Sequence, residues 1–194
     1  MIILASTSPT RRMMLANAGV SFDTASPEVD ERALVARNSA WAPEDISARL
    51  AEAKSLDVSL RHRRALVIGA DQVLVLEDKV YSKPADIEDC RRQLLELRGK
   101  SHRLISSVTC ARDGRAIWSF TDTAILTMRN FSDAFLDSYF AEQGAACLKS
   151  VGGYQIEGRG LQLFAAIAGD YFTILGLPLL PLLECLRREQ ELAS

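Results

Sequence analysis

Cysteine and histidine are scarce in this chain of 194 residues. The cysteines are Cys90, Cys110, Cys147 and Cys185, which are far apart and form no C-x-x-C pair, so neither a zinc ribbon nor a small disulfide scaffold is indicated. The two histidines stand in no Ser/His/Asp or Cys/His spacing typical of nucleophilic catalysis. We therefore expect reduced, packed thiols, a cytoplasmic location and no catalytic histidine.

The chain also lacks a strong charge of one sign and a long hydrophobic run. Its formal net charge is −2 and it has no long Lys/Arg tract, which argues against a nucleic-acid partner. The apolar stretch 172–186 is interrupted by Gly176, Pro178 and Pro181, and the apolar opening 2–5 is too short for a signal-peptide core. We expect no membrane partner.

A hydrophobic content of 48% is enough for a sizeable core, and we expect one domain over residues 1–194. Expected strands cover about residues 2–5, 20–25, 65–70, 73–76, 101–110, 116–128 and 161–167; expected helices cover about 11–18, 87–97, 133–142 and 178–189, with another beginning near 43. The turn Asp113-Gly114 is a strong hairpin signal. Because strands and helices alternate early and hairpins follow, the pattern predicts an α/β fold with a mixed sheet flanked by helices.

The first chemical motif lies between the opening strand and the first helix. Ser6, Ser8, Arg11 and Arg12 place two hydroxyls and two guanidiniums where free N–H groups and the helix dipole already favour an anion. These residues predict a phosphate cradle. The alternative is an ordinary N-cap serine followed by solvated arginines.

A second motif, Gly69-Ala70-Asp71-Gln72, is expected at the end of a buried strand. Asp71 could ligate a divalent ion or orient water, or it could be a turn aspartate that binds its own backbone. Lys83, beside Pro84, supplies a point charge for a phosphate, with a surface lysine as the alternative.

Two further charged residues are candidates. Glu31 is a candidate second metal ligand, because Mg²⁺ takes one or two carboxylates together with phosphate oxygens; the alternative is a solvated acidic turn. Lys54 lies beside the apolar positions Leu50 and Ala53 on an expected helix, so it either reaches inward or extends to solvent along the surface. We expect Lys83 to contribute more to catalysis than Lys54.

Several short motifs together resemble the Maf family over nearly the whole chain. They are Ile3-Leu4-Ala5-Ser6-x-Ser8-Pro9-x-Arg11, Val29-Asp30-Glu31, Gly69-Ala70-Asp71, Lys83-Pro84, Gly99-x-x-His102, Tyr154-x-Ile156-x-Gly158-x-Gly160, Gly169-Asp170-Tyr171 and Gly176-Leu177-Pro178. The resemblance implies a Maf/ITPase-like fold, with a bent sheet around a central cleft between two lobes, and a homodimer.

The same resemblance implies an enzyme that cleaves a nucleoside triphosphate between its α- and β-phosphates, with Asp71 as general base. Glu31, Lys83, Arg11 and Lys54 would correspond to residues that hold metal and phosphates. A Mg²⁺ or Mn²⁺ ion held by Glu31, Asp71 and triphosphate oxygens would activate water and clamp the substrate. Whether Asp71 acts mainly as base or as ligand stays open.

Within the family, Gln72 and Glu157 look like the branch that acts on 7-methyl-GTP. A carboxylate at Glu157 would attract the positive charge of a 7-methylated base. Thr10 departs from the tryptophan typical of that branch. The alternatives are a dTTP/UTP or broad non-canonical nucleotide pyrophosphatase, or a nucleotide-binding regulator of septum formation with little turnover.

Overall fold

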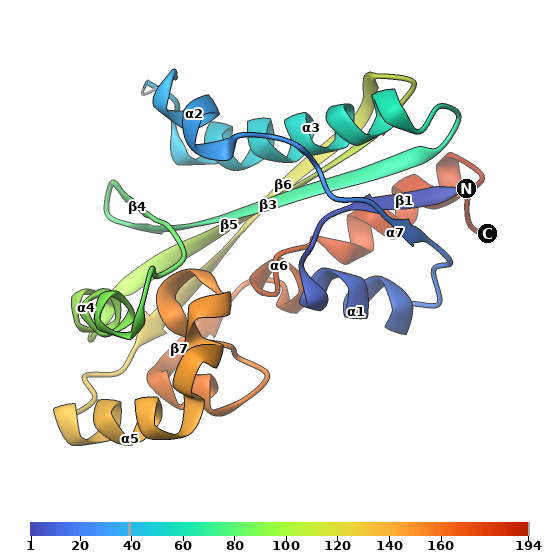
Figure 1. The fold of residues 1–194 in the computed structure, drawn as a ribbon. Coiled ribbons are helices and arrows are strands. Elements are labelled where there is room, and N and C mark those ends of the chain that lie inside the picture. The colour runs from blue at the N-terminus through green and yellow to red at the C-terminus, as the bar shows by residue number, and fades with distance from the viewer. Residues whose placement is uncertain (39, 194) are drawn as a thin grey trace. The chain divides into compact units, whose positions relative to one another are not determined.

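The structure is a computed structural model that describes residues 1–38 and 40–193 (Figure 1). Its elements in chain order are β1 (Ile2–Ala5), α1 (Pro9–Asn17), β2 (Asp23–Thr24), α2 (Glu31–Ala36), α3 (Pro43–Arg61), β3 (Leu66–Leu76), β4 (Lys79–Tyr81), α4 (Ile87–Leu97), β5 (Ser101–Arg112), β6 (Arg115–Met128), α5 (Asp133–Gln143), the 3₁₀ helices η1 (Gly144–Lys149), η2 (Val151–Gly153) and η3 (Arg159–Leu163), β7 (Phe164–Ala168), α6 (Tyr171–Ile174) and α7 (Leu179–Arg188).

The strands form one seven-stranded sheet in the order β2-β1-β3-β5-β6-β7, with β4 paired to β3. Strand β1 runs parallel to β2 and β3, whereas the pairs β3–β4 and β6–β7 are antiparallel. The predicted mixed α/β sheet flanked by helices is therefore confirmed. The Asp113-Gly114 turn is also confirmed, since both residues have the positive φ that a tight hairpin turn requires.

The chain divides into two compact units. Unit 1 comprises residues 1–72, 105–123 and 170–194, and unit 2 comprises residues 73–104 and 124–169. The strands β3, β5 and β6 contribute residues to both units. The single domain, the bend of the sheet and the central cleft stay predictions. Within residues 1–38 and 40–193, every helix is either too short or too polar to cross a membrane.

In unit 1 the two faces of the sheet pack against different helices. Ile3 and Val67 share a hydrophobic cluster with Val58 of α3, whereas Leu4 and Ile68 belong to the cluster that contains residues of α1 and α7. Figure 1 shows α3 and the α1/α7 pair on opposite sides of β1. Because side chains alternate along a strand, the consecutive residues at positions 71 and 72 of β3 face opposite sides.

Helix α3 approaches β3 at backbone distance. A Cβ atom at Gly69 would lie 2.2 Å from the carbonyl oxygen of Ala51 and 2.6 Å from the nitrogen of Ser55, so only glycine fits there. The buried face of α3 carries a row of small residues four apart, Ser47, Ala51, Ser55 and Ser59. A pattern of apolar residues does not predict this buried face, because three of its four residues are serines. Serine is polar, but it is small enough for the helix to lie directly against the strand.

Four local predictions were wrong. Asp71 lies inside β3 instead of at its end, because pairing with β4 over residues 74–76 continues the strand. The acidic turn expected at Asp30 and Glu31 is the beginning of α2: Glu31 is its first residue, and Asp30 caps the helix by accepting the Ala33 N–H. The strand expected over 20–25 is only two residues long, and residues 159–163 form η3 before β7 begins.

Candidate active site

Lys54 joins two carboxylates in unit 1. Its Nζ lies 2.6 Å from Oδ1 of Asp71 and 3.0 Å from Oε1 of Glu31. Lys54 and Asp71 are both only 7% exposed, whereas Glu31 is exposed. Of the two alternatives for Lys54, the inward orientation is therefore the observed one, and its charged head is paired.

Asp71 sits in an environment that makes it a better base. Burial raises the pKa of its carboxyl group above the ordinary value of 3.8, and the nearby charges of Lys54 and Arg11 partly oppose that rise. The carboxylate is thus costly to ionise yet has cations beside it that stabilise the ionised form. This combination is typical of a carboxylate that accepts a proton during catalysis.

The N-terminus of α1 presents two serine hydroxyls. Oγ of Ser8 accepts a hydrogen bond from the Arg11 N–H at 3.4 Å and so caps the helix, and Oγ of Ser6 accepts from the Ser8 N–H at 3.2 Å. Each hydroxyl hydrogen can still be donated to a ligand. The register of β1 on β3 pairs Ala5 with Gly69, which brings the start of this loop beside the segment that carries Asp71.

The two arginines of the first motif have different environments. Arg11 donates from Nε to the carbonyl oxygen of Gly176 and from Nη1 to that of Ala70, both at 2.8 Å. Burial lowers the pKa of Arg11, and the charges of Asp71 and Glu31 oppose that change. Arg12 is exposed. The serine N-cap of the alternative interpretation is therefore present, whereas its solvated arginines are seen only in part: Arg12 is exposed and Arg11 is half-buried.

The carboxylates beside Lys54 supply only two protein ligands for a divalent cation. Among the described residues, no group of three or more His, Cys, Asp or Glu side chains gathers into a possible metal site. Glu31 and Asp71 nevertheless converge on one ammonium group, so their oxygens lie close to each other. Two carboxylates completed by phosphate oxygens and water are a donor set that Mg²⁺ uses.

The other predicted site residues are distributed over the chain. Thr10 is half-buried in the first turn of α1, and Gln72 is half-buried on the opposite face of β3 from Asp71. Lys83 and Glu157 belong to unit 2, and both are exposed. The sequence predicted no role for Ser106, Asp122 or Thr173. Gln72 donates to the Ser106 hydroxyl and to the carbonyl oxygen of Thr173, and the Thr173 hydroxyl donates to Asp122. The nearest sequence signal was the Gly169-Asp170-Tyr171 motif.

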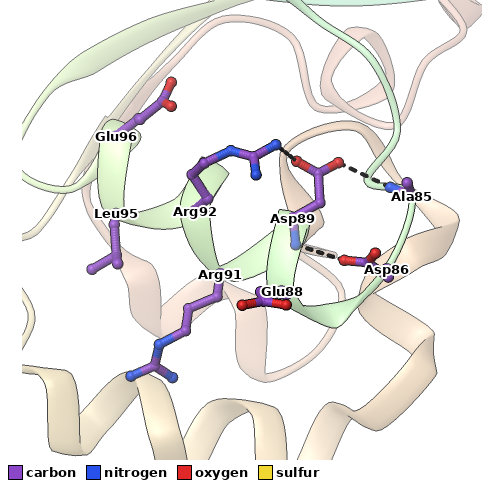
Figure 2. Close-up of a pocket in the computed structure, with 8 residues that line it drawn as sticks. All are labelled: Ala85, Asp86, Glu88, Asp89, Arg91, Arg92, Leu95 and Glu96. Atoms are coloured by element: carbon purple, nitrogen blue, oxygen red, sulfur yellow. Dashed lines mark hydrogen bonds and ion pairs between the residues drawn. The ribbon is translucent and has the colours of Figure 1, made fainter.

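Figure 2 shows a depression on unit 2 that includes none of these residues. It is lined by α4 and the two residues before it: Ala85, Asp86, Glu88, Asp89, Arg91, Arg92, Leu95 and Glu96. The central carboxylate, Asp89, pairs with Arg92 and accepts the Ala85 N–H, and Asp86 caps the helix. These charges satisfy one another and the start of α4, and the depression gives no sign of a phosphate site.

His102, in unit 2, is buried at 1% exposure. Its Nε2 lies 2.6 Å from the hydroxyl oxygen of Tyr154, and Phe164 lies beside both rings. Burial lowers the pKa of His102 to about 4, so the ring is neutral at pH 7. It is packed as a neutral hydrogen-bonding residue.

The fold and site together define a class: a mixed α/β protein with a serine-containing strand-loop-helix segment beside a buried aspartate–lysine pair. Comparison with known proteins identifies the family. Residues 1–189 match the family described as Maf-like protein, and the chain belongs to the Maf family. The resemblance predicted from the motifs is confirmed.

Relatives with assigned names cover nearly the whole chain. A protein of Brucella abortus biovar 1 (strain 9-941) named 7-methyl-GTP pyrophosphatase is 51% identical over 191 residues, covering 97% of this chain and 96% of that one. A protein of the same name from Mesorhizobium japonicum is 52% identical, with 96% and 94% covered. A nucleoside triphosphate pyrophosphatase of Paramagnetospirillum magneticum is 50% identical, with 98% and 99% covered.

Proposed function

We propose that this chain is a nucleoside triphosphate pyrophosphatase that hydrolyses the α–β phosphate bond of a modified nucleotide, with 7-methyl-GTP as the favoured substrate. The observation that supports this most is the buried Asp71 carboxylate, paired with Lys54 and influenced by the charge of Arg11, on a strand beside the Ser6/Ser8 loop. The names of the relatives at about 50% identity point to the same reaction.

In the proposed reaction a water molecule attacks the α-phosphorus and gives its proton to Asp71. The bond from the α-phosphorus to the bridging oxygen breaks, and pyrophosphate leaves with that oxygen. Ser6 and Ser8 donate to phosphate oxygens, while Arg11 and Lys54 offset the negative charge, as phosphoryl transfer requires. Keeping the lysine beside the base also favours the ionised, proton-accepting form of Asp71.

Glu31 and Asp71 are the residues that would hold a Mg²⁺ or Mn²⁺ ion, and such an ion neutralises phosphate charge and acidifies water when bound. Lys83 is proposed to stabilise the departing pyrophosphate. Gln72, Glu157 and Thr10 are proposed to set the choice of base, as the resemblance implies. A homodimer and a cytoplasmic location are part of the same proposal, and light scattering on the purified chain tests the first.

Pyrophosphate release from a panel of canonical and 7-methylated triphosphates, with Mg²⁺ and with chelator, tests the proposal. We expect turnover with 7-methyl-GTP preferred, loss of activity in chelator, and recovery on adding Mg²⁺ or Mn²⁺. Preference for dTTP and UTP would assign the chain to the other branch. Nucleotide binding without pyrophosphate release from any substrate would instead favour a regulator of septum formation with little turnover.

A further inference from the structure

Hydrogen bonds within unit 1 determine how the side-chain amide of Gln72 is oriented. Nε2 of Gln72 lies 2.9 Å from Oγ of Ser106, and 3.1 Å and 3.0 Å from the carbonyl oxygens of Thr173 and Ile174. Carbonyl oxygens only accept hydrogen bonds, so the nitrogen of the amide must face them. Oε1 of Gln72 is therefore directed away from this network.

That oxygen lies near Gly176. A Cβ atom at Gly176 would lie 3.4 Å from Oε1 of Gln72 and 3.5 Å from Nη2 of Arg11. The carbonyl oxygen of Gly176 in turn accepts the hydrogen bond from Nε of Arg11. The segment 173–176 thus contacts both an acceptor, on Gln72, and a cation, on Arg11, and the two groups lie near each other beside Gly176.

Asp122 of β6 anchors this segment through Thr173. Oγ1 of Thr173 donates to Oδ2 of Asp122 at 2.7 Å, while the Thr173 N–H donates to Oδ1 of Asp170 at 2.9 Å. Ser106 donates to the carbonyl oxygen of Thr173 at 2.7 Å. Helix α6 has only four residues, too few to be stable by itself, so tertiary contacts keep it in place: the packing of Phe172 and Leu175 on the core and the bonds of Thr173 to Asp122 and Ser106.

We propose that Asp122 and Thr173 are positioning residues that fix segment 170–176, so that the oxygen of Gln72 and the guanidinium of Arg11 are presented to the nucleotide. This rests on the proposed function. Neither residue is assigned a contact with substrate. Because Gln72 and Arg11 are assigned to binding and not to proton transfer, disturbing their support weakens substrate binding more than it slows the chemical step.

The test is Thr173→Val in the full chain, which removes the hydroxyl and keeps the shape of the side chain. For the best substrate of the parent chain we expect KM to rise about tenfold while kcat stays within about threefold, and Thr173→Ser to restore KM. Thr109→Val is the matched control: Thr109 is also buried, at 1% exposure against 0% for Thr173, and lies on β5 in the same unit. Equal kinetic changes in both valine variants would overturn the proposal.

A double-mutant cycle separates positioning from general loss of structure. If Thr173 acts through Gln72, Thr173→Val should raise KM little further in a Gln72→Ala background; fully additive effects would overturn the proposal. Asp122→Asn provides a second variant if Thr173→Val folds poorly.

Binding of an α,β-imido GTP analogue, measured by calorimetry, separates this proposal from the proposed function. Absence of turnover in the parent chain contradicts that function, whereas an unchanged Kd in Thr173→Val contradicts positioning.

Discussion

Replacing Asp71 with asparagine should remove turnover without unfolding the protein. Asparagine keeps the shape of the side chain but cannot accept the proton of water, and loss of a general base typically costs about 10²- to 10⁴-fold in rate. Each factor of ten is about 1.4 kcal/mol of transition-state stabilisation, so a loss of roughly 3–5 kcal/mol is expected in kcat/KM. Pyrophosphate release measured under single-turnover conditions reports this step.

The pH dependence checks the same reasoning. The folded state raises the pKa of Asp71, so the acid limb of kcat/KM for the parent chain should have its midpoint above 3.8, and any residual activity of Asp71→Asn should lack that limb. Because the pKa of Asp71 is higher in the folded state than in the unfolded state, protonation of Asp71 stabilises the fold. That stabilisation is complete below the unfolded pKa and is lost as the pH rises through the folded pKa. Asp71→Asn, which resembles the protonated form, should therefore unfold at the same or a higher temperature at pH 7.

Two outcomes would refute this account of Asp71. An acid limb centred at or below 3.8 would show that burial does not dominate at the carboxyl group. Activity within a few-fold of the parent chain in a folded Asp71→Asn variant would remove Asp71 from the role of general base.

Four further predictions concern charged or titratable residues of the two units. Lys54→Ala removes the nearest cation from Asp71, so the acid limb should move to higher pH; an unmoved limb contradicts the pairing. Pyrophosphate release by Lys83→Ala, compared with that by Lys54→Ala, tests whether Lys83 contributes more to turnover than Lys54, as we expect. Glu157→Gln should lower kcat/KM for 7-methyl-GTP about tenfold more than for GTP or UTP, and an equal loss on all three would exclude a charge-specific role. The pKa of His102 falls from 6.5 to about 4 on folding, so its contribution to stability is present above pH 6.5 and is lost as the pH falls through 4. That contribution amounts to about 3 kcal/mol, and urea unfolding of His102→Gln should show a weaker loss than the parent chain over that range.

The sequence alone identified the segments that carry local signals. Ser8 at the start of α1, Asp86 at the start of α4 and the Asp113-Gly114 turn depend on bonds or backbone angles within a few residues, so their types and spacing are sufficient. The motifs that contain Ser6 and Asp71 were likewise recognisable from their order and spacing.

Only the tertiary structure decided how these segments meet. Lys54 pairs with Asp71 because Gly69 lets α3 lie at backbone distance from β3, and a periodic pattern of apolar residues does not contain that distance. Arg11 bonds to the carbonyl oxygen of Gly176, 165 residues away, a contact that depends on α1 and α6 both packing against the sheet. The opposite faces taken by Asp71 and Gln72 follow from the unbroken course of β3, which pairing with β4 extends past the point where the local sequence suggests an end.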